Sequence, residues 1–228
     1  METSVAATVS QIGHSVSVTA GASPEFDRVK SVLEQRGVNG WADFGYFVNR
    51  PDLFRPSDLD ERAAMPVLLD LLQTLTDADA VAATARHLRR PWAKPIAFVP
   101  LVEAFTKWAA SSHTDAGWAL GDAVASAARS DDTETLISLV TDPAYGTARQ
   151  MIVHSLWRFR KDSRVANVLQ HLAEDPDVSL HAMGALRRTV GNDAALALLH
   201  RLSQTSPDRR VREQATKEMK KAERAARR

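Results

Sequence analysis

The chain has 228 residues and a formal net charge of +1, with 44% hydrophobic and 25% charged residues. These proportions are ordinary for a globular protein, and the near-zero charge excludes a global electrostatic field that would attract nucleic acid or a membrane surface. Cysteine is absent, which excludes disulfides, thiol nucleophiles and thiolate metal sites. The lack of cysteine fits a reducing cytoplasm and no apolar run approaches the roughly 18 residues of a membrane-spanning helix, so we expect a cytoplasmic protein.

The N-terminal residues are predicted to be a leader in front of the folded chain. Residues 1–23 are rich in Ser, Thr, Val, Ala and Gly and carry a single charge, so we expect them to be disordered. Pro24 suits the first position of a helix, and apolar residues then recur at spacings of three and four until Gly37. The first helix is therefore predicted between these two residues.

Two more helices complete a predicted N-terminal cap. Aromatic residues cluster on one side of a helix expected over residues 41–48. A further helix is expected over residues 59–75, with Ser57 as its N-cap and a kink near Pro66, because proline lacks a backbone donor. Terminal units of stacked structures need atypical faces, so residues 24–75 are interpreted as a helical cap and not as a ligand cage.

The middle of the chain predicts further helices. Residues 81–90 have a helical apolar period, and the prolines around Trp92 and Lys94 indicate an irregular link before residue 96. After the link, residues 96–110 and 117–129 are expected to form a helix pair with facing apolar sides.

The stretch from residue 133 to 219 repeats one unit three times: a short apolar run, an Asp/Pro break and a helix. The large residues that close these helices, Leu156, Leu186 and Met219, lie 30 and 33 positions apart. This period is typical of helical solenoids, because a helix pair buries its single apolar face only by stacking on its neighbours. We therefore predict an all-α, right-handed α-solenoid of about five helix pairs over residues 76–228, continuous with the cap.

A family resemblance rests on residues of the same three units. They are Asp142, Tyr145-Gly146 and Ala148-Arg149-Gln150-Met151 in the first, Asp175-Pro176-Asp177-Val178 and His181-Ala182-Met183-Gly184-Ala185-Leu186 in the second, and Val211-Arg212 with Ala215 in the third. On these residues the unit resembles the HEAT repeat, specifically the short bacterial HEAT-like repeats related to those of phycobilin lyases. The resemblance implies an armadillo-type superhelix. It also implies a binding scaffold that holds its partner on the concave row of second helices.

The sequence contains none of the motifs that would indicate a metal or nucleophilic enzyme. No histidine lies in an HExxH pattern, and the His-Glu dipeptides of the similar di-iron hydroxylases are missing. There is also no GxSxG elbow and no GxxxxGK loop. We predict no catalytic residue, no metal and no cofactor.

One enzymatic alternative remains open. Trp118 and Asp122 lie four positions apart and share a helix face. This pair resembles the Trp and Asp with which HEAT-like alkylpurine DNA glycosylases hold a damaged nucleotide, and Arg149 would be the backbone-contacting Arg of the following repeat. The later aromatic residue of those enzymes aligns near Ala185, which cannot stack on a base. In the alternative structural interpretation, Trp118 packs between repeats and Asp122 pairs with a neighbouring arginine.

Arginines also recur on or near successive second helices and could form a stripe that binds an acidic protein or a phosphate backbone. They could equally be ion-paired structural residues, since such arginines commonly pair with the Asp of the preceding turn. We predict a non-catalytic scaffold that binds a protein partner with an acidic surface, with nucleic-acid binding as the alternative and no membrane association. The predicted partner-binding surface consists of Trp118, Asp122, Arg149, Trp157, Arg158, Arg187, Arg188 and Arg212.

Overall fold

The computed structural model describes residues 23–45 and 58–226, and these residues form helices joined by short turns, without any strand. The α-helices are α1 (Pro24–Gln35), α2 (Glu61–Leu72), α3 (Ala78–Leu88), α4 (Lys94–Trp108), α5 (Thr114–Ala127), α6 (Thr133–Thr141), α7 (Gln150–Ser155), α8 (Arg164–Leu172), α9 (Ser179–Val190), α10 (Asn192–Thr205) and α11 (Arg209–Ala226). The 3-10 segments are η1 (Trp41–Asp43), η2 (Pro91–Ala93), η3 (Ser130–Asp132), η4 (Pro143–Arg149) and η5 (Leu156–Phe159).

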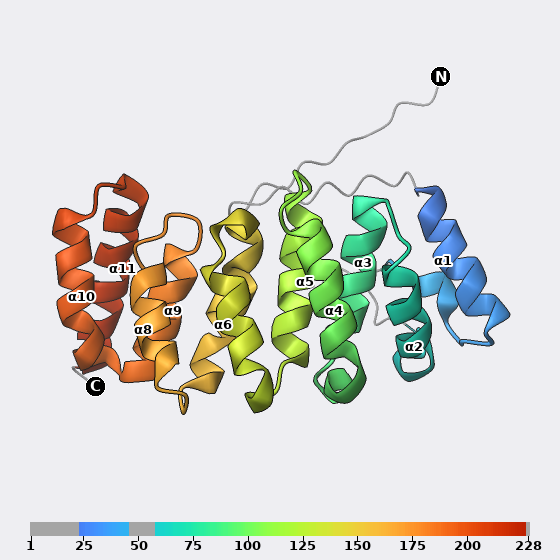
Figure 1. Cartoon of the computed structure of the whole chain (residues 1–228), viewed down its shortest axis with the longest axis horizontal. Helices are drawn as coiled ribbons and strands as arrows, with labels where there is room; N and C mark the ends of the chain where they lie inside the picture. The colour runs from blue at the N-terminus through green and yellow to red at the C-terminus, as the bar shows by residue number, and fades with distance from the viewer. Residues whose placement is uncertain (1–22, 46–57, 227–228) are drawn as a thin grey trace, which may run out of the picture.

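The helices pair in chain order and the pairs stack in a row (Figure 1). The five pairs are α2 with α3, α4 with α5, α6 with η4 and α7, α8 with α9, and α10 with α11. The second helices of these pairs, α3, α5, α7, α9 and α11, also pack on one another in succession, and we call their common outer side the second-helix face. α1 packs on α2 at the N-terminal end. The predicted all-α solenoid of helix pairs is confirmed.

Small residues on the second helices allow the pairs to stack closely. Ala148, Ala182 and Ala215 are buried, as are Leu156 and Leu186, which fill the space between helices. The core of the described residues runs without interruption from α1 into α11. Each pair thus buries its apolar face against its neighbours.

A glycine sets the closest approach between two pairs. A Cβ built on Gly121 of α5 would lie 2.5 Å from the backbone oxygen of Ala148, a distance that real Cβ atoms do not show. The α5 backbone therefore contacts η4 directly. Gly184, a helical glycine of α9, has no neighbouring atom within 4 Å of such a Cβ.

The helix predicted over residues 41–48 is wrong where it can be checked. The chain forms only the short segment η1 and then a turn at Phe44 and Gly45, with the remaining residues outside the described part. Gly45 has a φ of 96°, which ends any helix at this point because a right-handed helix requires negative φ.

The helix predicted over residues 59–75 begins later and ends earlier. The predicted N-cap Ser57 lies outside the described residues, and the side chain of Asp60 instead accepts a hydrogen bond of 3.1 Å from the amide of Ala63. This contact fixes the start of α2 at Glu61, because a capped amide needs no helical partner. Pro66 lies inside α2, as expected.

The irregular link predicted between residue 91 and a helix start at residue 96 is shorter than expected. It consists of η2, and α4 begins at Lys94 with Pro95 in its first turn. A proline is tolerated there because the first amides of a helix have no helical acceptor. Pro100 lies inside α4.

The helix predicted in the first clear repeat is divided into three segments. Gly146 has φ 44° and ψ −131°, which interrupts η4, and α7 and η5 follow as separate turns. Within the described part of the chain, no helix combines the length and the apolarity that crossing a membrane requires.

Candidate partner-binding surface

An aromatic side chain on the second-helix face is flanked by two guanidinium groups. Trp157 in η5 is half-buried, and the guanidinium carbon of Arg188, from α9 of the next pair, lies 5.3 Å from its ring centroid. The guanidinium carbon of Arg160 lies 5.9 Å from the same centroid. Both distances are within the range of cation–π attraction. We call Trp157, Arg158, Arg160 and Arg188 the Trp157 cluster.

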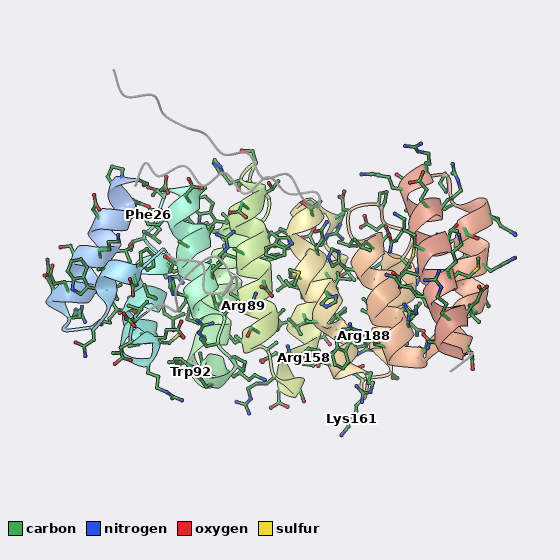
Figure 2. The ribbon with its side chains drawn as sticks, turned by 180° about the vertical axis from the view of Figure 1, so that it is seen from behind. Phe26, Arg89, Trp92, Arg158, Lys161 and Arg188 are labelled. Atoms are coloured by element: carbon green, nitrogen blue, oxygen red, sulfur yellow. The ribbon has the colours of Figure 1, made fainter. Side chains whose placement is uncertain are left out.

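The arginines of the Trp157 cluster are exposed and have no carboxylate partner within residues 23–45 and 58–226. Arg158 instead donates to the backbone oxygens of Ala125 and Ala128, at 2.7 and 3.5 Å. Lys161, which is also exposed, adds another cation beside them. Figure 2 shows Arg158, Arg188 and Lys161 gathered near the lower edge of neighbouring repeats.

Many other arginines of the described solenoid have acidic partners. The pairs between helices include Arg86–Asp115, Arg89–Asp122, Arg90–Glu61, Arg164–Glu134, Arg187–Glu218 and Arg201–Glu174. The three arginines of the Trp157 cluster differ from these residues, because none of them has a carboxylate partner in the described part of the chain. This contrast separates the cluster from the other charged parts of the surface.

Arg149 does not lie on the surface, so its assignment to the partner-binding surface is wrong. Its side chain is buried, with Nε donating to Gly146 O at 2.9 Å and Nη1 to Val140 O at 3.0 Å. Nη2 donates to the carboxylate of Asp175 at 2.8 Å. The partner is the Asp of the following repeat and not that of the preceding turn, so Arg149 joins two repeats.

Arg187 and Arg212 also have contacts inside the protein. The Arg187 guanidinium lies 2.5 Å from the buried carboxylate of Glu218 in α11, and its Nε donates to Asn192 at 3.1 Å. Arg212 donates to the backbone oxygens of Ser206 and Pro207, at 2.6 and 3.0 Å. These contacts hold α11 on its neighbours and compete with any role in binding.

Trp118 and Asp122 lie one turn apart on α5 and are both half-buried. The carboxylate of Asp122 lies 2.6 Å from the guanidinium of Arg89 at the end of α3. Burial lowers the pKa of the nearby His154, the positive charge of Arg188 lowers it further, and Asp122 acts in the opposite direction. The pKa of His154 thus responds to charged groups on the helix pairs before and after its own.

The three residues of the glycosylase alternative do not come together as a site. Arg149 is buried and bonded away from the surface, and Asp122 is already neutralised by Arg89. Ala185, which aligns near the missing aromatic residue, is itself buried in the core. Among the described residues, no group of three or more His, Asp or Glu side chains is placed to hold a metal ion.

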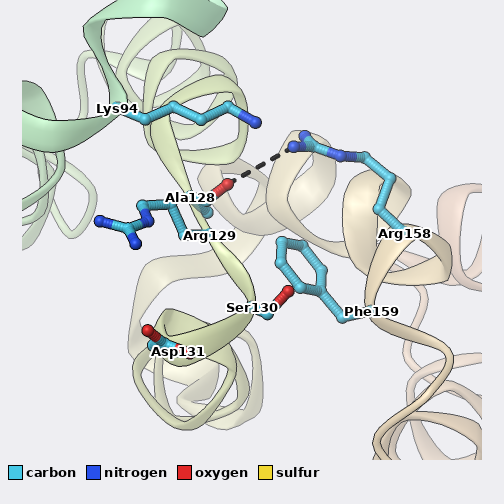
Figure 3. A pocket seen from close by; sticks show the side chains of 7 residues that line it. All are labelled: Lys94, Ala128, Arg129, Ser130, Asp131, Arg158 and Phe159. Atoms are coloured by element: carbon cyan, nitrogen blue, oxygen red, sulfur yellow. Dashed lines mark hydrogen bonds between the residues drawn. The ribbon is translucent and has the colours of Figure 1, made fainter.

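A groove opens beside the Trp157 cluster (Figure 3). It has a volume of about 380 Å³ and is lined by Lys94, Ala128, Arg129, Ser130, Asp131, Arg158 and Phe159. The groove lies where the C-terminal end of α5 meets the start of α4 and the η5 turn.

Sequence reasoning missed Arg89, Lys94 and Arg129. Arg89 and Asp122 are separated by 33 residues, which is close to the repeat period, so a search for opposite charges one period apart would have found this pair. Lys94 and Arg129 carry no comparable signal. They line the same groove as Arg158 only because helix ends of different pairs lie next to one another.

The comparisons with known proteins agree with this architecture. Residues 133–220 match the family model of HEAT repeats. No curated protein and no solved structure matches the chain. HEAT repeats are commonly protein-interaction scaffolds. The repeats of residues 133–220 are therefore HEAT repeats.

Proposed function

We propose that the protein is an interaction scaffold that binds an acidic segment of a protein partner at the Trp157 cluster. The single observation that carries this proposal is the arrangement of Arg188 and Arg160 beside Trp157, without a carboxylate partner among the described residues. The common role of HEAT repeats as interaction scaffolds supports the class of function.

The composition of the cluster fits a protein interface. Trp and Arg are the residues most enriched at positions that dominate binding energy, because they combine a large apolar contact with directed hydrogen bonds. Arginine presents a planar fork of donors that suits carboxylates, and its stacking on Trp157 limits the side-chain freedom lost on binding. An acidic segment would neutralise guanidinium groups that the solenoid itself leaves unneutralised.

The contrast between two adjacent arginines supports a binding role for Arg188. Arg187 and Arg188 are adjacent, yet Arg187 bonds to Glu218 while Arg188 lies over Trp157 and remains exposed. If both served only the fold, a carboxylate would be expected near Arg188 as well, since an unpaired cation on a cationic surface repels its neighbours.

Capture of the partner by matched variants tests the proposal. Wild-type protein, a double variant with Arg160→Glu and Arg188→Glu, and a control with Lys217→Glu and Lys220→Glu are used as baits. Each is incubated with nuclease-treated lysate of the source organism, and retained proteins are quantified by mass spectrometry. The control reverses two exposed charges on α11, outside the cluster.

We expect one discrete set of proteins to be retained by the wild type and the control and lost from the cluster variant. Retained proteins should bind the purified wild type directly, with an affinity that falls as salt rises. Equal retention by all three baits would contradict the proposal. Recovery that depends on omission of nuclease would assign the cluster to nucleic acid instead.

A further inference from the structure

The groove beside the Trp157 cluster brings together cations from separate helix pairs. Lys94 begins α4, Arg129 follows α5, and Arg158 lies in η5. In Figure 3 the amine of Lys94 and the guanidinium of Arg158 extend toward each other past the carbonyl of Ala128. The side chain of Arg129 extends to the other side.

The lining of the groove has an excess of positive charge. Three cations, Lys94, Arg129 and Arg158, stand against one carboxylate, Asp131, which gives a formal charge of +2. None of the three cations forms an ion pair within residues 23–45 and 58–226. Since most other arginines of this solenoid are paired, an excess confined to a groove points to a ligand of opposite charge.

Arg158 is held in place before any ligand arrives. Its Nη1 donates to Ala125 O at 2.7 Å, and its Nη2 lies 3.5 Å from Ala128 O. A guanidinium has five N–H donors, so donors remain after these contacts. The guanidinium carbon also lies 5.4 Å from the ring centroid of Phe159, which forms part of the groove wall. A fixed guanidinium loses little side-chain entropy when an oxyanion binds.

Stabilisation of the C-terminal end of α5 explains only part of this arrangement. Cations near a helix C-terminus are favourable, and Arg158 satisfies two carbonyl groups there. Lys94, however, makes no side-chain hydrogen bond to these carbonyl groups, and Arg129 extends away from them. The charges of Lys94 and Arg129 therefore remain available to a ligand.

We propose that this groove binds one oxyanion group, a carboxylate or a phosphoryl group, on the peptide segment recognised by the Trp157 cluster. The inference rests on the proposed function, because Arg158 belongs to both the cluster and the groove. An acidic side chain of the segment enters between Lys94 and Arg158, while neighbouring residues of the segment contact Trp157. The groove thus determines where along the surface the segment docks.

Titration of the isotopically labelled full chain with short peptides tests this site by amide NMR. The probes are a glycine-flanked triglutamate peptide, the same peptide with phosphoserine at its centre, and a triglutamine peptide. We expect saturable shifts at Ser130, Asp131 and Phe159 with the anionic peptides only. The stronger of the two anionic probes identifies the source of the oxyanion.

Two variants and one control link the shifts to the groove. Lys94→Glu is expected to weaken binding of the anionic peptides by about fivefold or more, because an attractive contact becomes repulsive. Lys94→Gln should weaken binding less, and Lys217→Glu on α11 should leave it unchanged. Circular dichroism and the melting temperature establish that each variant is folded.

The outcomes separate this inference from the proposed function. Equal shifts with the glutamine peptide, or unchanged affinity in both Lys94 variants, would overturn the groove site even if the variant with Arg160→Glu and Arg188→Glu loses its protein partner. Peptide-induced shifts in the groove that weaken in the Lys94→Glu variant would support the site. This holds even if the variant with Arg160→Glu and Arg188→Glu still captures the protein partner. Shifts produced by an oligothymidylate but by neither anionic peptide would overturn the peptide assignment.

Discussion

The guanidinium of Arg149 lies 2.8 Å from the carboxylate of Asp175, so the second helix of one pair is bonded to the turn that starts the second helix of the next. Arg149 is 1% exposed, and its guanidinium also donates hydrogen bonds to the backbone oxygens of Val140 and Gly146. A buried cation with acceptors at three points connects α6, η4 and the turn between α8 and α9. The ion pair therefore connects two consecutive helix pairs, and we call it the joint between them.

Removal of this joint should destabilise the fold. Arg149→Met leaves two backbone carbonyl groups without their donor and a partly exposed carboxylate without its cation, so we expect a loss of about 3 kcal/mol in the free energy of unfolding. Chemical denaturation followed by circular dichroism measures it. The control is Arg201→Met, which breaks an exposed pair with Glu174 and should cost less than about 1 kcal/mol. Similar losses in both variants would show that Arg149 is not a joint.

The same substitution should destabilise the protein strongly at one of two adjacent arginines and hardly at the other. Arg187→Glu places a carboxylate beside the buried Glu218, and we expect a loss of about 2–4 kcal/mol because an attractive buried pair becomes repulsive. Arg188→Glu changes an exposed side chain and should alter stability by less than about 0.5 kcal/mol. Thermal unfolding of both single variants tests the difference. If Arg188→Glu is the more damaging change, the division between structural and binding arginines is incorrect.

Two helical glycines provide a matched test of the packing between repeats. Gly121→Ala forces a methyl group against the Ala148 backbone, so we expect a net loss of about 1 kcal/mol or more in spite of the higher helix propensity of alanine. Gly184→Ala meets open space and should stabilise the protein by up to about 1 kcal/mol. Denaturant midpoints of the two variants should therefore move in opposite directions. A gain in both would contradict the close approach of α5 and η4.

Acid should weaken the N-terminal end of the solenoid through Glu61. Partial burial acts to raise the pKa of this carboxyl, but its contacts with His87 and Arg90 outweigh burial and lower the pKa from 4.5 to about 2. Because the folded pKa is depressed, the stabilising contribution is present above about pH 4.5 and is lost as the pH falls toward 2.

Comparison of two glutamate variants checks this pH dependence. We expect the stability difference between the wild type and Glu61→Gln to be largest near neutral pH and to shrink between pH 4.5 and 2. Glu103→Gln is the control, since Glu103 is exposed on α4 and forms no ion pair within the described residues. A difference that stays constant over this pH range would show that Glu61 does not titrate as expected.

The architecture was predictable because it repeats. The spacing of Leu156 and Leu186 and the small residues between them are consequences of stacking, so the sequence carries the same signal in several copies. The turn after Trp41 occurs once, and its aromatic residues match a helix as well as they match η1. A turn that occurs only once was therefore not predicted, whereas the repeated helix pairs were.

The roles of individual arginines could not be predicted from their positions along the chain. Arg187 and Arg188 are neighbours in sequence but lie about 100° apart around a helix, so one reaches Glu218 and the other lies over Trp157. Arg149 looked like a surface residue because two of its three acceptors, Val140 O and the Asp175 carboxylate, lie on other segments. The sequence shows where the arginines occur. Whether an arginine is buried depends on how the next repeat packs against it.

Site-specific photo-crosslinking tests the central claim most directly, that the partner docks at the Trp157 cluster. A photoreactive amino acid replaces Lys161 beside the cluster, or Arg201 on α10 as the control position, and crosslinked peptides are identified after irradiation in cells. The account predicts adducts at position 161 that map to an acidic segment of a protein, with few adducts at position 201. Adducts at 201 together with none at 161 would place the interaction on another face and contradict the account.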